Sequence, residues 1–149
     1  MSQEELKASI KALEDIEAIK KLKSDYCYYI DTRNLDAWAS LFAEDAELDY
    51  DVIGTPEAGE NIKAYMERSM EPYAFTRHMA HDPKIEVNGD KASGRWYFHG
   101  ASTFKGAEGT IACAWGRYEE EYVRVGGEWK IKYIRFMLDL VNMMQTVQA

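Results

Sequence analysis

The sequence predicts an α+β fold in which N-terminal helices pack on a strongly curved antiparallel sheet and enclose a pocket. Apolar residues recur every three or four positions in the first part of the chain, which is typical of helices. After Pro72 the period changes to two, which is typical of strands. Helices grouped before strands indicate an α+β arrangement. We expect a single domain over residues 1–149.

The first helix is predicted over residues 5–31. Its apolar face is formed by residues three or four positions apart: Leu13, Ile16, Ile19, Leu22, Tyr26 and Tyr29. The charged residues are expected mostly on the opposite face: Glu14, Asp15, Glu17, Lys20, Lys21 and Lys23. The helix should end near Asp31–Asn34, where Thr32 or Asn34 can cap a second short helix. The apolar face of that helix is Leu35, Trp38, Leu41 and Phe42.

Later segments alternate between turn signals and periodic runs. Residues 46–50 read as a short strand, and a third helix is expected from about Pro56 to Met70. Asn88-Gly89-Asp90 lies between two alternating runs, which predicts a hairpin. A long strand follows over 109–123, and Gly126-Gly127 precedes the last predicted strand, 129–134. The pattern leaves the structure of residues 138–149 open.

Composition excludes several classes of protein. The hydrophobic fraction of 46% and the aromatic fraction of 13% indicate a folded chain with a core. A net charge of −8 argues against nucleic acid or an anionic membrane surface as the partner. We see neither a membrane-spanning run nor a signal peptide. Cys27 and Cys113 have no metal-binding or redox spacing, so we expect free thiols and a cytoplasmic location.

A carboxylate and two histidines are the strongest candidates for chemistry. Asp31 ends the first predicted helix, and His78 and His81 begin the sheet. A carboxylate beside an imidazole can perform acid–base chemistry near neutral pH. On a strand, His78 and His81 would point to opposite faces unless a bulge intervenes. The alternatives are a helix cap for Asp31, a packed core histidine, and a metal site completed by His99.

The aromatic residues provide further candidates for a ligand pocket. A tyrosine hydroxyl in an apolar cavity can polarise a carbonyl group or hold a water molecule. The tyrosines that could do so are Tyr26, Tyr29, Tyr50, Tyr97 and Tyr118. The candidates for substrate contact are Tyr29, Tyr50, His81, Tyr97, Trp115 and Arg135. Packing in the sheet core is the alternative for the aromatic residues, and solvation is the alternative for Arg135.

Four stretches make the chain resemble the SnoaL-like branch of the NTF2-like superfamily over about residues 8–137. They are Asp15–Lys20, the pair Tyr26 and Asp31, His78–His81 with Pro83, and Gly94–Tyr97. Within that branch the chain looks most similar to bile acid 7α-dehydratases. Scytalone dehydratase and hexachlorocyclohexane dehydrochlorinase resemble it more distantly.

The resemblance implies a cone with an Asp–His dyad inside. It implies that His78 removes a proton, that Asp31 orients the imidazole and stabilises its cation, and that Tyr26 assists at a carbonyl or leaving group. His81 matches a histidine of the bile acid enzymes, and Arg135 falls near an arginine in their last strand.

The function expected from these features is a lyase without a cofactor, of the dehydratase type. Its substrate would be a hydrophobic, oxygenated ring compound such as a steroid or polyketide. No glycine-rich phosphate loop is visible, which supports a reaction without a nucleotide. The alternatives are a non-catalytic ligand-binding or oligomerisation module of the NTF2-like type, and an isomerase or cyclase on the same fold.

Self-association is also expected. Residues Thr110–Gly116 carry no charge on either face of their predicted strand, whereas a half-exposed strand normally has a polar face. We therefore expect a homo-oligomer, either a dimer or a trimer.

Overall fold

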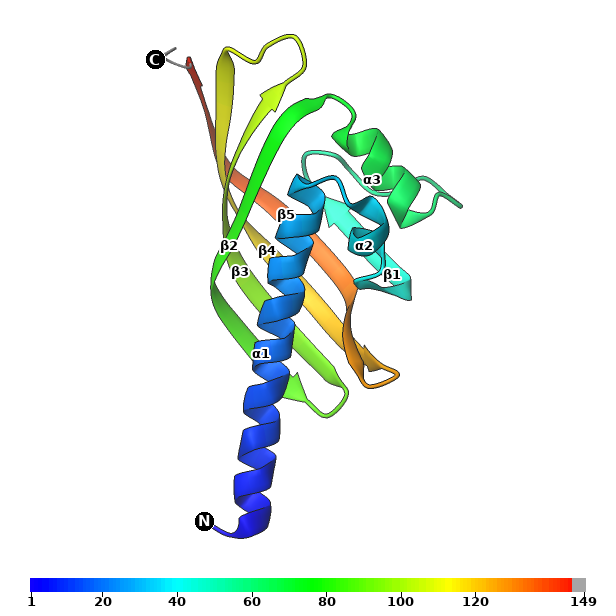
Figure 1. The fold of residues 1–149 in the computed structure, drawn as a ribbon, viewed down its shortest axis with the longest axis vertical. Helices are drawn as coiled ribbons and strands as arrows, with labels where there is room; N and C mark the ends of the chain where they lie inside the picture. Colours follow the sequence, from blue (N-terminus) through cyan, green and yellow to red (C-terminus); the bar gives the residue numbers. More distant parts are fainter. Residues whose placement is uncertain (146–149) are drawn as a thin grey trace.

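A computed structural model describes residues 1–145, in which three helices pack on a five-stranded curved sheet (Figure 1). The helices are α1 (Gln3–Asp31), α2 (Leu35–Ala39) and α3 (Ile62–Met70). The strands are β1 (Phe42–Tyr50), β2 (Tyr73–Asn88), β3 (Lys91–Phe104), β4 (Thr110–Val125) and β5 (Glu128–Gln145). This confirms the predicted α+β class. No helix of residues 1–145 is long and apolar enough to cross a bilayer.

The sheet has the order β1-β5-β4-β3-β2. Strands β2 to β5 form the predicted antiparallel run, whereas β1 pairs in parallel with β5, with Leu48 beside Ile134. Register shifts interrupt the pairing of β2 with β3 between His81 and Lys84, and the pairing of β4 with β5 at two places. Such bulges bend a strand and increase its twist, so they help to curve the sheet around a cavity.

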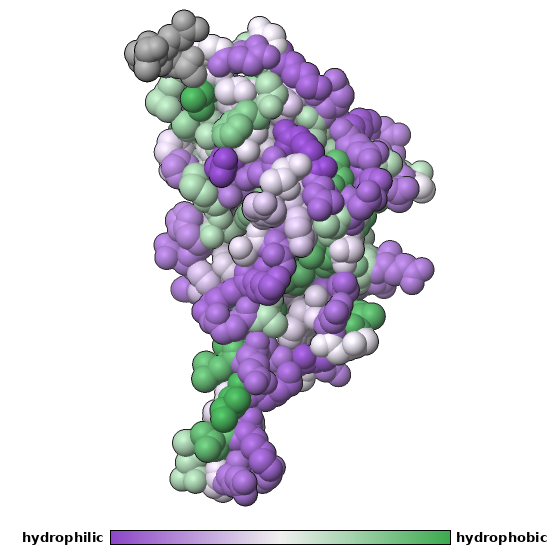
Figure 2. Space-filling model, viewed as in Figure 1, coloured by the Kyte–Doolittle hydropathy of each residue, from purple (hydrophilic) through white to green (hydrophobic). Residues whose placement is uncertain are grey.

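Helix α1 crosses the concave face of the sheet and carries the core side chains of the helical layer. Ser2 and Glu5 form a capping box at its N-terminus, which satisfies backbone N–H groups there. Ile19, Tyr26 and Ile30 are buried against the sheet. The N-terminal turns project beyond the sheet, and Figure 2 shows hydrophobic colour on this projecting end. Leu13, predicted on the buried face, is therefore 64% exposed.

Several predicted boundaries are wrong. Helix α3 begins at Ile62, after the N-cap residue Asn61, and not near Pro56. Phe42 belongs to β1 and not to the second helix. Strand β5 continues through Gln145, well beyond the predicted end at residue 134, so most of the segment left open pairs with β4. Residues 146–149 lie outside the described residues.

Two charged residues of α1 are buried, although the sequence pattern placed most of its charges in solvent. Asp15 accepts hydrogen bonds from Arg124, Lys11 and Trp129. The Arg124 guanidinium, with Lys11 and Trp129, holds the pKa of the Asp15 carboxyl far below its usual range. Lys23 forms a buried ion pair with Glu120 of β4. The charged side chains therefore join the helix to the sheet.

Glu120 is the centre of a hydrogen-bonded group in the core. One carboxylate oxygen contacts the Lys23 ammonium, and the other accepts from the Tyr122 hydroxyl. The Trp96 indole donates to that hydroxyl at 2.9 Å. The Lys23 ammonium also lies 3.4 Å from the centre of the Tyr118 ring and 4.2 Å from that of Tyr26. Every charge in this group has a partner, which is the condition under which charges are tolerated in a core.

Removing the Glu120 carboxylate should destabilise the fold strongly. Glu120→Ala leaves the Lys23 ammonium buried without its counter-charge, and we expect a loss of about 3–5 kcal/mol of unfolding free energy. Urea denaturation measures this loss. Glu119→Ala, at a half-exposed position next in sequence, is the control and should change stability by less than about 0.5 kcal/mol. A Glu120→Ala protein as stable as that control would show that the ion pair adds nothing.

Candidate active site

An apolar cavity of about 360 Å³ lies between the helices and the concave face of the sheet. Its walls are mainly apolar side chains: Ile30, Met66, Met70, Phe98, Phe104, Phe136, Leu138 and Val141. A smaller set of lining residues is polar or charged: Tyr26, Tyr50, Tyr73, Thr76, Arg77, His78, Ser102 and Tyr118. An apolar pocket with a few polar groups is the usual form of a small-molecule site.

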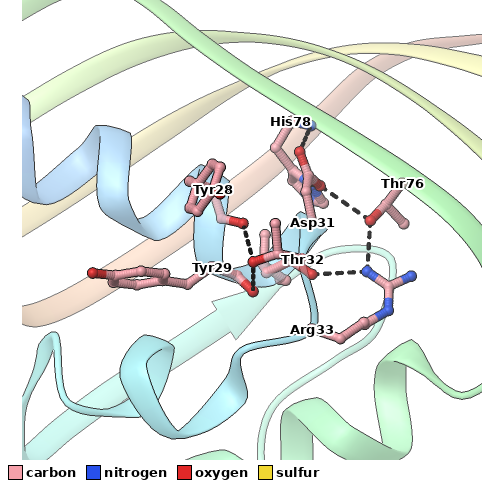
Figure 3. Close-up of polar contacts among 8 residues, drawn as sticks. Tyr28, Tyr29, Asp31, Thr32, Arg33, Thr76 and His78 are labelled. Atoms are coloured by element: carbon pink, nitrogen blue, oxygen red, sulfur yellow. Dashed lines mark hydrogen bonds and ion pairs between the residues drawn. The ribbon is translucent and has the colours of Figure 1, made fainter.

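Asp31 and His78 meet at this cavity, as the sequence predicted (Figure 3). The last residue of α1 supplies the carboxylate, and β2 supplies the imidazole. Asp31 Oδ1 lies 2.6 Å from His78 Nδ1, and Asp31 Oδ2 accepts from the backbone N–H of His78 at 2.8 Å. Side-chain exposure is 17% for His78 and 12% for Asp31, so the contact is largely shielded from water.

The contact between Asp31 and His78 determines which ring nitrogen is available for chemistry. An ionised carboxylate only accepts hydrogen bonds, so a neutral imidazole bonded to it carries its proton on Nδ1. Nε2 is then unprotonated and can accept a proton. The carboxylate also stabilises the imidazolium that this transfer would produce.

The backbone opposite His78 is a glycine. Gly100 pairs with His78 across β2 and β3. A Cβ atom at Gly100 would collide with the Phe98 ring and with the Arg77 carbonyl oxygen. The absence of a side chain therefore lets the Phe98 ring lie over the strand and 5.6 Å from the His78 ring.

Three tyrosines bring hydroxyl groups to the same cavity. The hydroxyls of Tyr26 and Tyr50 are hydrogen-bonded at 2.9 Å, and the ring of Tyr118 packs on Tyr26 at a centroid distance of 6.1 Å. Burial raises the pKa of Tyr26, Tyr50 and Tyr118 well above the usual value. These phenols therefore keep their protons at neutral pH. One hydroxyl of the Tyr26–Tyr50 pair donates to the other, so the remaining hydroxyl of the pair or that of Tyr118 can donate to an oxygen atom of a ligand.

The other predicted substrate contacts lie away from this cavity. Tyr29 is on the flank of α1, and its ring points away from the dyad (Figure 3). His81 is exposed beside Asp82, with its ring near that of Tyr97. Tyr97 is 55% exposed and Trp115 is 39% exposed. Arg135 is half-exposed, 3.6 Å from Asp49.

Strand geometry explains why most of these residues lie outside the cavity. Successive strand residues point to opposite faces of a sheet. Trp96 and Phe98 are buried, so Tyr97 between them faces outward. Ile134 and Phe136 are likewise buried and place Arg135 outward. Tyr29, His81, Tyr97, Trp115 and Arg135 therefore do not line this cavity, and their contact with a ligand stays a prediction.

Sequence reasoning missed four polar residues around the site. Thr76 donates to Asp31 Oδ1 at 3.0 Å, and Arg33 donates to Thr76 at 2.8 Å. Lys23 and Glu120 lie behind the rings of Tyr26 and Tyr118. Two of the four could have been found from the two-residue alternation of strand faces. Thr76 lies on the same strand face as His78, and Glu120 lies on the same face as Tyr118 and Tyr122.

The profile of the SnoaL-like domain matches residues 11–135. The chain belongs to the SnoaL-like family. An uncharacterised protein of Mycobacterium tuberculosis, Rv2910c, is 27% identical over 124 residues, which are 83% of this chain and 84% of that one.

Solved structures share the fold of this SnoaL-like domain. A hexachlorocyclohexane dehydrochlorinase, LinA type 2, has a TM-score of 0.83 and 23% identity, covering 95% of this chain and 96% of its own. A Novosphingobium aromaticivorans protein provisionally named scytalone dehydratase has a TM-score of 0.80 and 22% identity, covering 95% and 93%. At these identities the likeness shows the fold. The particular similarity to bile acid 7α-dehydratases stays a prediction.

Proposed function

We propose that this SnoaL-like domain is a lyase that removes water or another leaving group from a hydrophobic, oxygenated ring compound without a cofactor. The observation that carries the proposal is the hydrogen bond between Asp31 and His78 at the wall of an apolar cavity. A cavity that only bound a ligand would not need a carboxylate placed on the buried side of an imidazole. Partial desolvation of both groups would be a cost without a purpose.

The proposed reaction begins with His78. Nε2 takes a proton from a carbon next to an activating carbonyl, and the electrons of the C–H bond move toward the carbonyl oxygen. Asp31 stabilises the imidazolium, and the hydroxyls of Tyr26, Tyr50 or Tyr118 donate to the oxygen that gains charge. The bond to the leaving group then breaks. When that group is hydroxide, it takes a proton back from Nε2 and departs as water, which regenerates the neutral imidazole.

The cavity also supports a class of substrate. Its volume of about 360 Å³ lies at the lower end of the range for drug-sized ligands. The lining is mainly apolar, so a ring compound can bury its carbon skeleton there while an oxygen contacts the tyrosines. The names of two structural neighbours, a dehydrochlorinase and a dehydratase, describe eliminations and agree with this class of reaction.

An isomerase or cyclase remains the nearest alternative, because it would use the same base in the same position. The two reactions differ in where the proton goes after it reaches Nε2. Elimination gives it to the leaving group, whereas isomerisation returns it to another carbon. Product analysis distinguishes these outcomes once a substrate is known.

A ligand screen by thermal shift should identify the substrate class. Hydroxylated steroids and polyketide rings should raise the melting temperature, because a ligand at about 100 times its Kd adds about 2.7 kcal/mol of stability. Ala114→Phe, which places a large side chain at the cavity wall, should lose the shift. Tyr97→Ala, on the outer face, should keep it. An equal shift in both variants would place the ligand outside this cavity.

Substitution of the dyad should abolish turnover of any substrate that the screen supplies. His78→Ala and Asp31→Ala should each lower kcat by about 10²–10⁴-fold, because a positioned base contributes roughly that factor. The double variant should be little worse than either single one, since the two residues act as a unit. Asp31→Asn should also be slow, because it loses the charge that stabilises the imidazolium.

The matched control for the dyad variants is His81→Ala. It removes an exposed imidazole from the same strand and should leave kcat near that of the unaltered protein. Near-normal kcat in the His78→Ala protein would make His78 a packing residue and leave a binding module as the better description.

We also propose that the protein forms a homo-oligomer. Strand β5 exposes two pairs of apolar side chains near its end, on either side of Asn142, so apolar residues occur on both faces there: Leu140, Val141, Met143 and Met144. Exposed apolar surface of this kind commonly marks an association site. Light scattering at micromolar concentration should give a dimer or trimer mass, and Leu140→Lys with Met144→Lys should lower it. A monomer mass for the unaltered protein would contradict the proposal.

A further inference from the structure

We infer that Arg33 and Thr76 are positioning residues that hold the Asp31 carboxylate against His78 and so keep the proton of the neutral imidazole on Nδ1. The inference rests on the proposed function, because it assigns a purpose to groups around the proposed base. Arg33, Thr76, Asp31 and His78 form one connected chain of hydrogen bonds (Figure 3).

The direction of every hydrogen bond in this chain follows from the groups involved. A guanidinium can only donate, so Arg33 Nη1 donates to Thr76 Oγ1 at 2.8 Å. The single proton of the Thr76 hydroxyl is then directed to Asp31 Oδ1, 3.0 Å away. An ionised carboxylate can only accept, so the proton between Asp31 Oδ1 and His78 belongs to Nδ1. The arginine thereby fixes the direction of the hydrogen bond from Thr76 to Asp31, and the carboxylate fixes the direction of the hydrogen bond from the ring.

The carboxylate is held at both oxygens. Oδ1 accepts from Thr76 and from the imidazole, and Oδ2 accepts from the backbone N–H of His78. Thr76 and His78 are two positions apart on β2, so the strand itself keeps these donors at a fixed spacing. Thr76 is 6% exposed, so water has little access to its hydroxyl.

The backbone at Arg33 supports a role for its side chain. Arg33 has φ +59°, a conformation that glycine adopts without strain and other residues adopt at a cost. It follows the C-cap of α1, where Arg33 N–H donates to the Ile30 carbonyl and Asn34 N–H donates to that of Tyr29. This is the Schellman arrangement, whose left-handed position usually holds glycine. Hydrogen bonds from the Arg33 guanidinium to Ile30 O and Thr76 offset the strain and need the side chain that glycine lacks.

The chemical consequence concerns the lone pair on Nε2. If the carboxylate turned away, His78 could carry its proton on Nε2, and that nitrogen could no longer accept a proton from a substrate. Arg33 and Thr76 prevent this without taking part in proton transfer themselves. Their effect should therefore be visible in the ring of His78 before any substrate is bound.

The test is ¹⁵N NMR of the histidine rings in the ligand-free, full-length protein, at a pH at which the rings are neutral. The two ring nitrogens differ strongly in chemical shift according to which one carries the proton. The sequence has three histidines, so His81→Ala and His99→Ala assign the signals. We expect the unaltered protein to show His78 protonated on Nδ1.

Three variants separate positioning from general stability. Thr76→Val keeps the shape and loses the hydroxyl, and it should move the two His78 nitrogen shifts toward each other as the Nε2–H form gains population. Thr76→Ser keeps the hydroxyl and should retain the original pattern. Arg33→Gly suits the left-handed backbone but removes the guanidinium, and it should shift the pattern in the same direction as Thr76→Val. Arg95→Gln removes an exposed arginine elsewhere and should have no effect.

The result that overturns the inference is an unchanged Nδ1–H pattern in Thr76→Val. If Arg33→Gly does not fold, the comparison of Thr76→Val with Thr76→Ser still decides the matter. The measurement needs no substrate, so it is independent of the proposed reaction. If His78 is protonated on Nδ1 but the protein has no turnover, the lyase proposal is contradicted and the positioning role stands. If the protein has turnover but the His78 nitrogen shifts are unchanged in Thr76→Val, the positioning role is contradicted and the lyase proposal stands.

Discussion

The buried ion pair between Lys23 and Glu120 is the contact on which the position of α1 depends. A charge that leaves water must meet its counter-charge, so α1 can lie on the sheet in only one axial and rotational register without leaving Lys23 unpaired. Tyr26 follows Lys23 by about one turn of helix, and Asp31 ends the same helix. The ion pair therefore fixes where the tyrosine enters the cavity and where the carboxylate meets β2.

The arrangement of polar groups along α1 connects stability with chemistry. Lys23 is neutralised by Glu120 and covered by the Tyr118 and Tyr26 rings, so these rings separate a charged core from an apolar cavity. Asp31, in contrast, is hydrogen-bonded to the ring of His78, which lines the cavity. The same helix thus uses one charge to hold the fold and another to orient the ring of the proposed base. Because the site is largely shielded from water, interactions between Asp31 and a developing imidazolium are stronger than they would be at the surface.

Sequence periodicity predicted the local structure well and the long-range polar contacts poorly. Alternation from Ala92 to Phe98 identified the buried face of β3, and the spacing of His78 and His81 put them on opposite faces, as the structure shows. Tyr97, Trp115 and Arg135 were chosen by residue type and by resemblance. Alternation along their strands instead places them on the face opposite the buried side chains. Arg33 and Lys23 were out of reach because their partners Thr76 and Glu120 are 43 and 97 positions away. The end of β5 lacked alternation, so only its pairing with β4 reveals it as a strand.

The position of the dyad also limits what the site can do with a proton. His78 Nδ1 is engaged by Asp31, so Nε2 is the nitrogen through which a proton can both arrive and leave. In the proposed reaction, base and acid steps would both occur at this atom, and the outcome would depend on which ligand atom lies near Nε2 after the first transfer. A leaving oxygen there gives elimination, and a second carbon gives isomerisation. The proposed base would serve both reactions. The shape of the apolar wall, which would orient a bound ring against Nε2, would then select between them.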